Sequence, residues 1–494
     1  MTINTADKIV TMEEIKINNK RHRWFQSPLL LPAIAILAGL FWLAQNGKIL
    51  GIRGPLFLVL LAQVIFFILM LRRPIWAVAA LIVGQLTACN FMLPIGTAIS
   101  LRLLWALPAF LLVVGMIIIN GKIKLGKQAG RIVIPAIIFF VVAAISNYVN
   151  TDMSITLQYL RTNIPAFLIL LLLPATVENE EDLKRLAIVV LITCSVSAVF
   201  AVLQTLSFHF PIPSFSLSED ALAYNRVAGL SESSIQLAWV LPMALLPIVV
   251  MYFGGNLSNR IKKLMILLAI VISTALFFTY TRSGLYSLIP GIFIIGIMMK
   301  GKLRIRFFLV ILILLAAFGL FVSTSNNRYS ESFGDDASSS GRLVLWQAGI
   351  NIALDHPVLG IGAYQFMDVS TEYASTINPS FLENPGSGKA LGRVAAHDDF
   401  ITIWSSFGTV AMLAFLWVFV SIFRNFMESY RRSKSPFLRS ISLGCVVALL
   451  ALMVNMATHN VMDSTILLWI VAGFSIATVK IASSNGTFKA GKIR

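Results

Sequence analysis

The chain has 494 residues, of which 57% are hydrophobic and only 12% are charged. It contains repeated apolar runs of about 18 to 20 residues, the length that crosses the hydrocarbon core of a bilayer, so the composition excludes a soluble domain and predicts an all-α polytopic membrane protein. The net charge of +17 does not require a nucleic-acid partner, because short cytoplasmic loops of membrane proteins accumulate Lys and Arg.

Hydropathy along the chain predicts about 12 to 14 transmembrane helices and one large external loop. The first apolar run follows a basic tail and shows no small-residue cleavage site, so we expect a retained anchor. The fourteen expected spans lie near residues 28–46, 54–71, 75–93, 103–119, 132–149, 156–173, 186–207, 235–253, 264–280, 284–299, 306–323, 398–423, 440–458 and 464–481.

The distribution of basic residues predicts the orientation. If the N-terminus is cytoplasmic, eight basic segments all fall on the inner side, and they hold 29 of the 39 Lys and Arg residues. This asymmetry predicts that both termini are cytoplasmic. Because the charge is spread over eight segments and not gathered in one patch, no nucleic acid is expected as a partner. The segments are 8–23, 72–73, 122–131, 184–185, 260–263, 300–306, 424–439 and 480–494.

We therefore expect one membrane domain. Cys89, Cys194 and Cys445 all fall within expected spans, where packing is a simpler explanation than a disulfide framework. The expected parts are a cytoplasmic tail at 1–27, transmembrane helices 1–11 within 28–323, a large extracytoplasmic loop at 324–397, transmembrane helices 12–14 within 398–481 and a cytoplasmic tail at 482–494.

The external loop changes character along its length. "NNRYSESFGDDASSSG" is polar and acidic, typical of a solvated segment. In the following "RLVLWQAGINIALDHP", Leu343, Trp346, Ile350 and Leu354 are spaced as one stripe of a helix, which Pro357 and the glycines after it end. We expect a short amphipathic helix that lies against the membrane surface or caps the spans beneath it and holds Arg342 at headgroup level.

Basic residues outside the inner segments are few. Arg226 lies in "YNRVAGL", Arg282 in the short connection "FTYTRSGLYS", and Arg161 a few residues into the sixth span. An arginine at the centre of a span costs roughly 2.5 to 3.5 kcal/mol, so one near a span end is expected to snorkel, pair with an acid or bind an anion. The sequence leaves these alternatives open.

Two of the five histidines stand at expected external ends of spans. His397 in "VAAHDDFITIW" is followed by Asp398 and Asp399, and His459 lies in "ATHNVMD". An imidazole near a carboxylate suits a general base that takes a proton from an attacking hydroxyl, although an interfacial histidine is more often structural. No metal site is expected, because adjacent helical residues point in different directions and no second ligand set is visible.

The order of three segments carries a family resemblance. "FTYTRSGLYS", "SGRLVLWQAGINIALDHPVLGIGAYQF" and "AHDDFITIWSSFGTVAMLAFLWVF" follow one another on the expected external face. Over roughly residues 200 to 475 the chain resembles the O-antigen ligase and O-antigen polymerase superfamily of bacterial membrane glycosyltransferases. That family combines a span-end arginine, a loop arginine before a Leu-Trp helix, a P-x-x-G-x-G turn and a loop histidine.

The resemblance implies roles for single residues. Arg282 and Arg342 correspond to arginines that engage the pyrophosphate of a polyprenyl-linked donor, and His397 to the histidine that assists the acceptor hydroxyl. The family usually has Asn after this histidine, and Asp398 takes that place here, which puts the hydrogen bonding of the histidine in question. Arg226, Arg161 and His459 are secondary candidates.

The implied activity is a metal-independent, inverting transfer of a polyprenyl-pyrophosphate-linked glycan to a glycan, lipid or other hydroxyl-bearing acceptor, with no cofactor. The implied place is the bacterial cytoplasmic (inner) membrane, with an extracytoplasmic active site and with membrane lipids and other polysaccharide-assembly proteins as candidate partners. Whether the enzyme is a ligase or a polymerase stays open.

Two other classes of function remain. A transporter or flippase of lipid-linked sugars would have ionisable residues deep within its spans and broken helices in corresponding halves. A scaffold for an envelope-assembly complex would use Arg282, Arg342 and His397 as interface residues.

Overall fold

The structure is a computed structural model. The chain divides into two compact units. Unit 1 comprises Met1–Ile68 and Met92–Ile99, and its described part consists of two antiparallel strands, β1 (Lys48–Ile49) and β2 (Ile52–Arg53). Unit 2 comprises Leu69–Phe91 and Ser100–Arg494. The described residues are 48–49, 52–53, 74–87, 125–209, 226–231, 233–255, 257–299, 301–324, 336–378, 396–464 and 466–487, so the expected spans at 28–46, 54–71 and 103–119 lie outside them.

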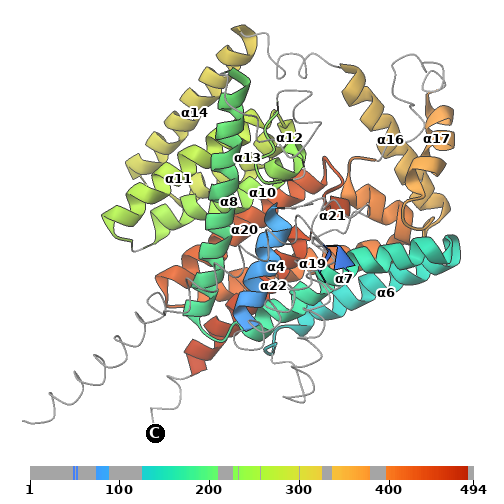
Figure 1. Cartoon of the computed structure of the whole chain (residues 1–494), viewed down its shortest axis with the longest axis horizontal. Coiled ribbons are helices and arrows are strands. Elements are labelled where there is room, and N and C mark those ends of the chain that lie inside the picture. The colour runs from blue at the N-terminus through green and yellow to red at the C-terminus, as the bar shows by residue number, and fades with distance from the viewer. Residues whose placement is uncertain are drawn as a thin grey trace, which may run out of the picture. The chain divides into compact units, whose positions relative to one another are not determined.

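The described part of unit 2 is built from helices (Figure 1). Nine of its described helices are long and apolar enough to cross a membrane, and Pro74–Thr87 and Arg282–Met298 are shorter apolar stretches. The expected all-α polytopic fold is confirmed. The helices are α4 (Pro74–Thr87), α6 (Gly130–Asn150), α7 (Met153–Thr176), α8 (Glu180–His209), α10 (Ser234–Gly254), α11 (Asn259–Phe278), α12 (Arg282–Tyr286), α13 (Leu288–Met298), α14 (Gly301–Thr324), α16 (Asp336–Asp355), α17 (Phe366–Ile377), α19 (Asp399–Arg432), α20 (Pro436–Met456), α21 (Val461–Ser464) and α22 (Leu467–Thr487).

Two helices differ from the hydropathy prediction. The expected span 284–299 consists of two shorter helices, α12 and α13, which meet at Ser287. The helix α19 continues nine residues past the expected end at 423, to Arg432. Hydropathy falls at Arg424, but the helix goes on because Phe426 and Ser429 remain buried against its neighbours.

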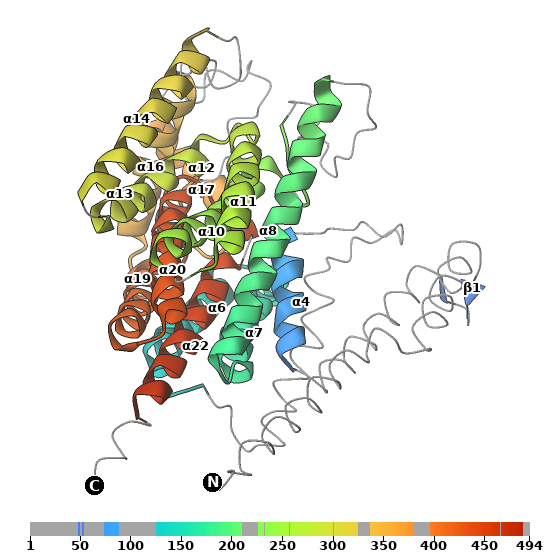
Figure 2. The same ribbon diagram turned by 90° about the vertical axis from the view of Figure 1, so that its left-hand side faces the viewer.

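The core of unit 2 lies where α19 packs on α6, α20 and α22, while α20 packs on α10 and α8 lies beside α4 and α11 (Figure 2). The aromatic rings of Phe139 and Phe415 are fully buried with their centroids 5.2 Å apart, and Trp469 lies 6.2 Å from Phe139. The side chains of α14, by contrast, are largely exposed, as at Leu312 and Leu315. An apolar helix whose side chains are this exposed within the described part of the chain is suited to contact with lipid.

The loop between α14 and α19 carries two helices, α16 and α17, which lie side by side and pack on α19 (Figure 1). Leu345, Ala348 and Ile352 of α16 face this protein core. The helix α16 therefore covers the span α19, but not with the expected stripe, since Leu343, Ile350 and Leu354 are exposed. Small residues on the packed face of α16, such as Ala348, let this helix approach α17 and α19 closely. A prediction based only on large apolar side chains misses this face.

The turn after α16 replaces backbone hydrogen bonds that a kink removes from α19. Gly408 has a left-handed φ of 80°, and the helix is interrupted there. The N–H groups of Ile361 and Gly362 donate to the carbonyls of Ser405 and Ser406, and Thr409 N–H donates to the carbonyl of Pro357. A Cβ on Gly408 would overlap the backbone of Val358. The glycines are therefore needed for a close backbone approach that fixes the loop to α19.

Candidate active site

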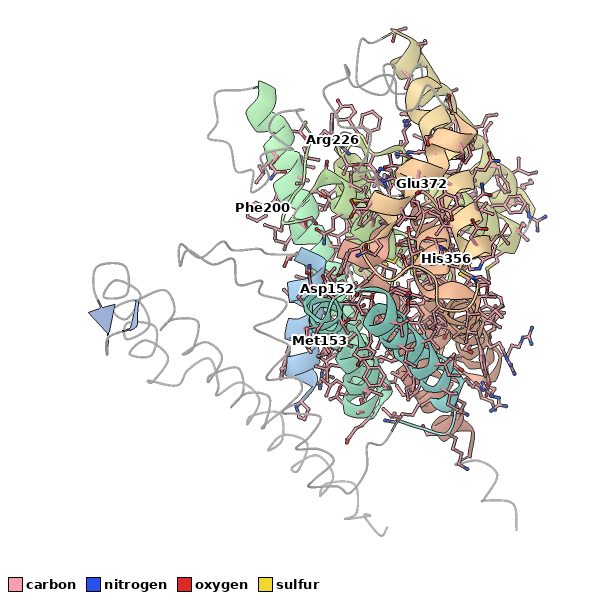
Figure 3. The ribbon with its side chains drawn as sticks, turned by 90° about the vertical axis from the view of Figure 1, so that its right-hand side faces the viewer. Asp152, Met153, Phe200, Arg226, His356 and Glu372 are labelled. Atoms are coloured by element: carbon pink, nitrogen blue, oxygen red, sulfur yellow. The ribbon has the colours of Figure 1, made fainter. Side chains whose placement is uncertain are left out.

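Arg226 precedes α10 and is held by the corner between α11 and α12. Its Nε donates to the backbone carbonyl of Thr279 over 2.8 Å, and its terminal nitrogen donates to Thr281 Oγ1 over 2.6 Å. Figure 3 labels this residue among the side chains of unit 2. Arg282, the first residue of α12, follows Thr281 directly, so the same corner carries two arginines.

Arg342 comes from the loop helix α16 and is half-buried. Its guanidinium lies 3.4 Å from the carbonyl oxygen of Thr458, just after α20. Burial lowers the pKa of Arg342, and the charge of Arg282 lowers it further. Because this Coulomb effect weakens with distance, it places the two guanidinium groups near each other although α13 and α14 separate them in the sequence.

His397 stands immediately before α19 in a left-handed conformation with φ of 53°. For a residue other than glycine this conformation costs roughly 1 to 2 kcal/mol. The preceding residue is fixed, because Trp346 Nε1 of α16 donates to the carbonyl of Ala396 over 2.9 Å. Burial lowers the pKa of His397, and the charge of Arg342 adds to this effect. The imidazole is therefore neutral at pH 7 and able to accept a proton.

His459 lies between α20 and α21, with its ring perpendicular to that of His397 and the ring centroids 5.8 Å apart. The ring of Trp239 in α10 also lies near His459, with the two ring centroids 5.8 Å apart. Burial, as the largest cause, and four neighbouring titratable groups lower the pKa of His459 to about 3. In order of effect they are Arg342, His397, Arg226 and Arg282.

These interactions bring together five residues that we call the basic cluster: Arg226, Arg282, Arg342, His397 and His459. The cluster combines permanently charged guanidinium groups, which bind phosphate oxygens, with neutral imidazoles, which accept protons. Such a set is suited to bind an oxyanion beside a hydroxyl that loses its proton.

The two aspartates after His397 both contact backbone N–H groups. Asp398 caps α19, since its side chain accepts from Ile401 N–H over 3.0 Å. Asp399 accepts from the N–H groups of Val461 and Met462 over 2.9 and 3.1 Å. The Asp399 carboxylate thereby ties the segment of His397 to the segment of His459.

Of the remaining secondary candidates, Arg161 lies in α7, and its side chain is outside the described part. Among the side chains that the structure describes, no group of three His, Cys, Asp or Glu residues is arranged to hold a metal ion. Sequence reasoning overlooked four residues around the cluster, although Thr279 and Thr281 stand within the quoted "FTYTRSGLYS". The overlooked residues are Trp239, Thr279, Thr281 and Thr458.

A cavity of about 680 Å³ is lined by α10, α13 and α20 and by the segment between α19 and α20. Lys434 and Arg439 border it, both from the expected inner segment 424–439. It contains no member of the basic cluster. A smaller cavity of about 180 Å³ borders the cluster, with Ala396 and Asn460 in its wall.

The chain matches the model of a known protein family, whereas no curated protein matches it. The family described as O-antigen ligase matches residues 264–416, which include Arg282, Arg342 and His397 and the turn that fixes the loop to α19. This match confirms the resemblance of the chain to the O-antigen ligase and polymerase superfamily.

Proposed function

We propose that this protein transfers a glycan from a polyprenyl-pyrophosphate donor to a hydroxyl-bearing acceptor during synthesis of a surface polysaccharide. The family match supports a role in glycan transfer at the level of the family. The observation that carries the proposal for this chain is the convergence of Arg282, Arg342 and His397. Arg342 donates to the carbonyl of Thr458, next to His459, whose ring centroid lies 5.8 Å from that of His397, and Arg282 is close enough to lower the pKa of Arg342.

The arginines stabilise the leaving group. As the bond between the anomeric carbon and the pyrophosphate oxygen breaks, its electron pair stays on the polyprenyl pyrophosphate and negative charge accumulates there. Arg282 and Arg342 stabilise that charge with planar, permanently charged donors. The same positive charge repels a divalent cation, which supports a reaction without a metal ion.

His397 acts on the hydroxyl of the acceptor. Its neutral imidazole takes the proton of the acceptor hydroxyl as the oxygen forms a bond to the anomeric carbon. Attack from the face opposite the departing pyrophosphate inverts the configuration of that carbon. His459, with a still lower pKa, keeps the neighbouring position uncharged and so does not add to the repulsion on a protonated His397.

We place this reaction at the outer face of the bacterial cytoplasmic membrane, with both termini inside. The distribution of basic residues supports this orientation. A membrane-impermeant maleimide tests it on two single-cysteine variants of a cysteine-free chain in intact cells. Leu354→Cys on α16 should react, and Lys434→Cys should react only after the cells are opened. The opposite pattern would contradict the orientation.

Reconstituted protein with a polyprenyl-pyrophosphate-linked oligosaccharide tests the activity itself. Transfer should persist in EDTA and release polyprenyl pyrophosphate. A product that remains attached to polyprenyl pyrophosphate would identify a polymerase, and a product on another acceptor would identify a ligase. If the donor only crosses the bilayer without a change in its glycan, the protein is a transporter and the proposal fails.

A further inference from the structure

The smaller cavity lies directly beside the histidines. Ala396, the residue before His397, and Asn460, the residue after His459, both line its wall. No arginine of the basic cluster lines it. We propose that this cavity binds one sugar ring of the acceptor glycan and presents its hydroxyl to His397, an inference that rests on the proposed function.

The lining suits an uncharged sugar. Aromatic rings of Tyr159, Tyr364 and Phe407 offer flat apolar surface for the C–H face of a pyranose. Amide and hydroxyl groups of Asn163 and Thr402 can hydrogen-bond to its hydroxyls. Because the described lining includes the carboxylate of Asp399 and neither lysine nor arginine, it disfavours the donor pyrophosphate.

One buried acceptor in the cavity wall has no hydrogen-bond partner within the described part of the chain. Asn460 Nδ2 donates to Thr402 Oγ1 over 2.9 Å, while Asn460 Oδ1 is buried and accepts nothing there. A buried amide oxygen left without a donor costs about 1 to 3 kcal/mol. Because this oxygen exposes less than 1 Å² of surface, a sugar hydroxyl would supply the missing donor only after the Asn460 side chain rotates toward the cavity.

The size of the cavity fits a single ring. Its volume of about 180 Å³ leaves room for one sugar ring. One pyranose fills such a space, and a longer glycan would have to extend beyond it. The cavity therefore selects the terminal unit of an acceptor.

The position of the cavity agrees with inversion at the anomeric carbon. Its walls come from α6, α7, α19 and the start of α17, whereas the arginines are fixed by Thr279, Thr281 and Thr458. In the sequence, His459 stands between Thr458, which binds Arg342, and Asn460 of the cavity wall. An acceptor hydroxyl would thus approach from the cavity while the pyrophosphate departs on the arginine side.

Tyr364 is held at the cavity in a strained conformation. Its φ is 64°, in the left-handed region, and it is 44% exposed. The residue before it is anchored, because Ala363 N–H donates to Asn147 Oδ1 over 2.6 Å. A non-glycine residue kept in this conformation points to a function for its side chain.

Steady-state kinetics of the full chain in lipid nanodiscs test the proposal. Tyr364→Ala should raise KM for the acceptor about tenfold, the effect of losing roughly 1.4 kcal/mol of binding, and leave KM for the donor unchanged. Tyr364→Phe keeps the ring and should behave like wild type. Tyr148→Ala, a matched change at an exposed tyrosine of α6 outside the cavity, should have no effect. An unchanged acceptor KM in Tyr364→Ala, or a rise in the donor KM alone, would overturn the proposal.

A binding measurement separates this proposal from the proposed function. Saturation-transfer NMR with methyl glycosides of glucose, galactose, rhamnose and N-acetylglucosamine should detect at least one ligand for wild type and a weaker signal for Tyr364→Ala. If the protein shows no transfer but binds a glycoside through Tyr364, the proposed transferase function is wrong and the proposed sugar site is supported. If transfer proceeds and Tyr364→Ala changes neither the acceptor KM nor glycoside binding, the proposed sugar site is wrong while the proposed transferase function is supported.

Discussion

The Asp399 carboxylate accepts a hydrogen bond from the backbone N–H of Val461 over 2.9 Å and so connects two segments that are far apart in the sequence. One segment carries His397 and the other His459, and their rings lie 5.8 Å apart. The geometry of the histidine pair therefore depends on a residue that contributes no imidazole or guanidinium group of its own.

Asp399→Ala should disturb this geometry. Hydrogen bonds to a charged group contribute about 1.5 to 3 kcal/mol, so the variant should unfold at a lower temperature than wild type. We also expect a lower kcat, because His397 is less well positioned, with KM for the donor unchanged. Thermal unfolding and steady-state kinetics check both. Asp368→Ala, at an exposed position in the first turn of α17, serves as the control, and equal effects of the two changes would contradict a positioning role.

The pH dependence of His397 should respond to Arg342. Burial and the positive charge of Arg342 lower the pKa of His397, so the imidazole is neutral at pH 7 and becomes protonated only below its ordinary pKa of 6.5. Replacing Arg342 with Gln removes one cause, and the pKa of His397 should rise. NMR titration of histidine-labelled protein measures this without requiring activity. A titration midpoint that stays constant or falls in Arg342→Gln would contradict the assigned proximity.

A lysine at position 226 should not perform the function of Arg226. The guanidinium donates through two nitrogens, to the carbonyl of Thr279 and to Thr281 Oγ1, and an ammonium group cannot reproduce this fork. We expect kcat/KM for the donor to fall about tenfold or more, because the corner that carries Arg282 loses its anchor. Lys262→Arg, an exchange of basic residues at the start of α11, provides a control. Wild-type kcat/KM in Arg226→Lys would contradict this account.

The kink of α19 should not tolerate a side chain. Gly408→Ala places a Cβ against the carbonyl of Val358 and forces an alanine to a φ of 80°. The strain of such a conformation is about 1 to 3 kcal/mol, so the melting temperature should fall. Gly341→Ala in α16, where no atom lies within 4 Å of the added Cβ, should leave stability equal or slightly higher. Equal melting temperatures for the two variants would contradict the assigned close approach.

Hydropathy predicted the long spans because eighteen apolar residues suffice to identify one. Hydropathy failed where neither the length nor the composition of a segment indicates its structure. The kink at Gly408 lies within an apolar run that reads as continuous helix, and its cause is the distant turn at 357–362. The helix α17 has only 12 residues and few large apolar side chains, so no span-length pattern indicates it.

The candidate site was predicted in part. The motif order indicated Arg282, Arg342 and His397, and the fold brings them near Arg226 and His459, which the sequence ranked second. The backbone contact of Asp399 could not be predicted, because it depends on how the segment between α20 and α21 returns to the start of α19. The functions of these residues in glycan transfer stay predictions.

A comparison of two histidine variants tests the central claim most directly. Transfer by reconstituted wild type, His397→Ala and His356→Ala should be measured with the same lipid-linked donor, after matched melting temperatures and donor binding establish that all three are folded. His356 is exposed in the turn after α16 and provides the matched control (Figure 3). Loss of a general base should lower kcat of His397→Ala by about 10²- to 10⁴-fold while His356→Ala matches wild type. Wild-type kcat in His397→Ala would contradict the proposed mechanism.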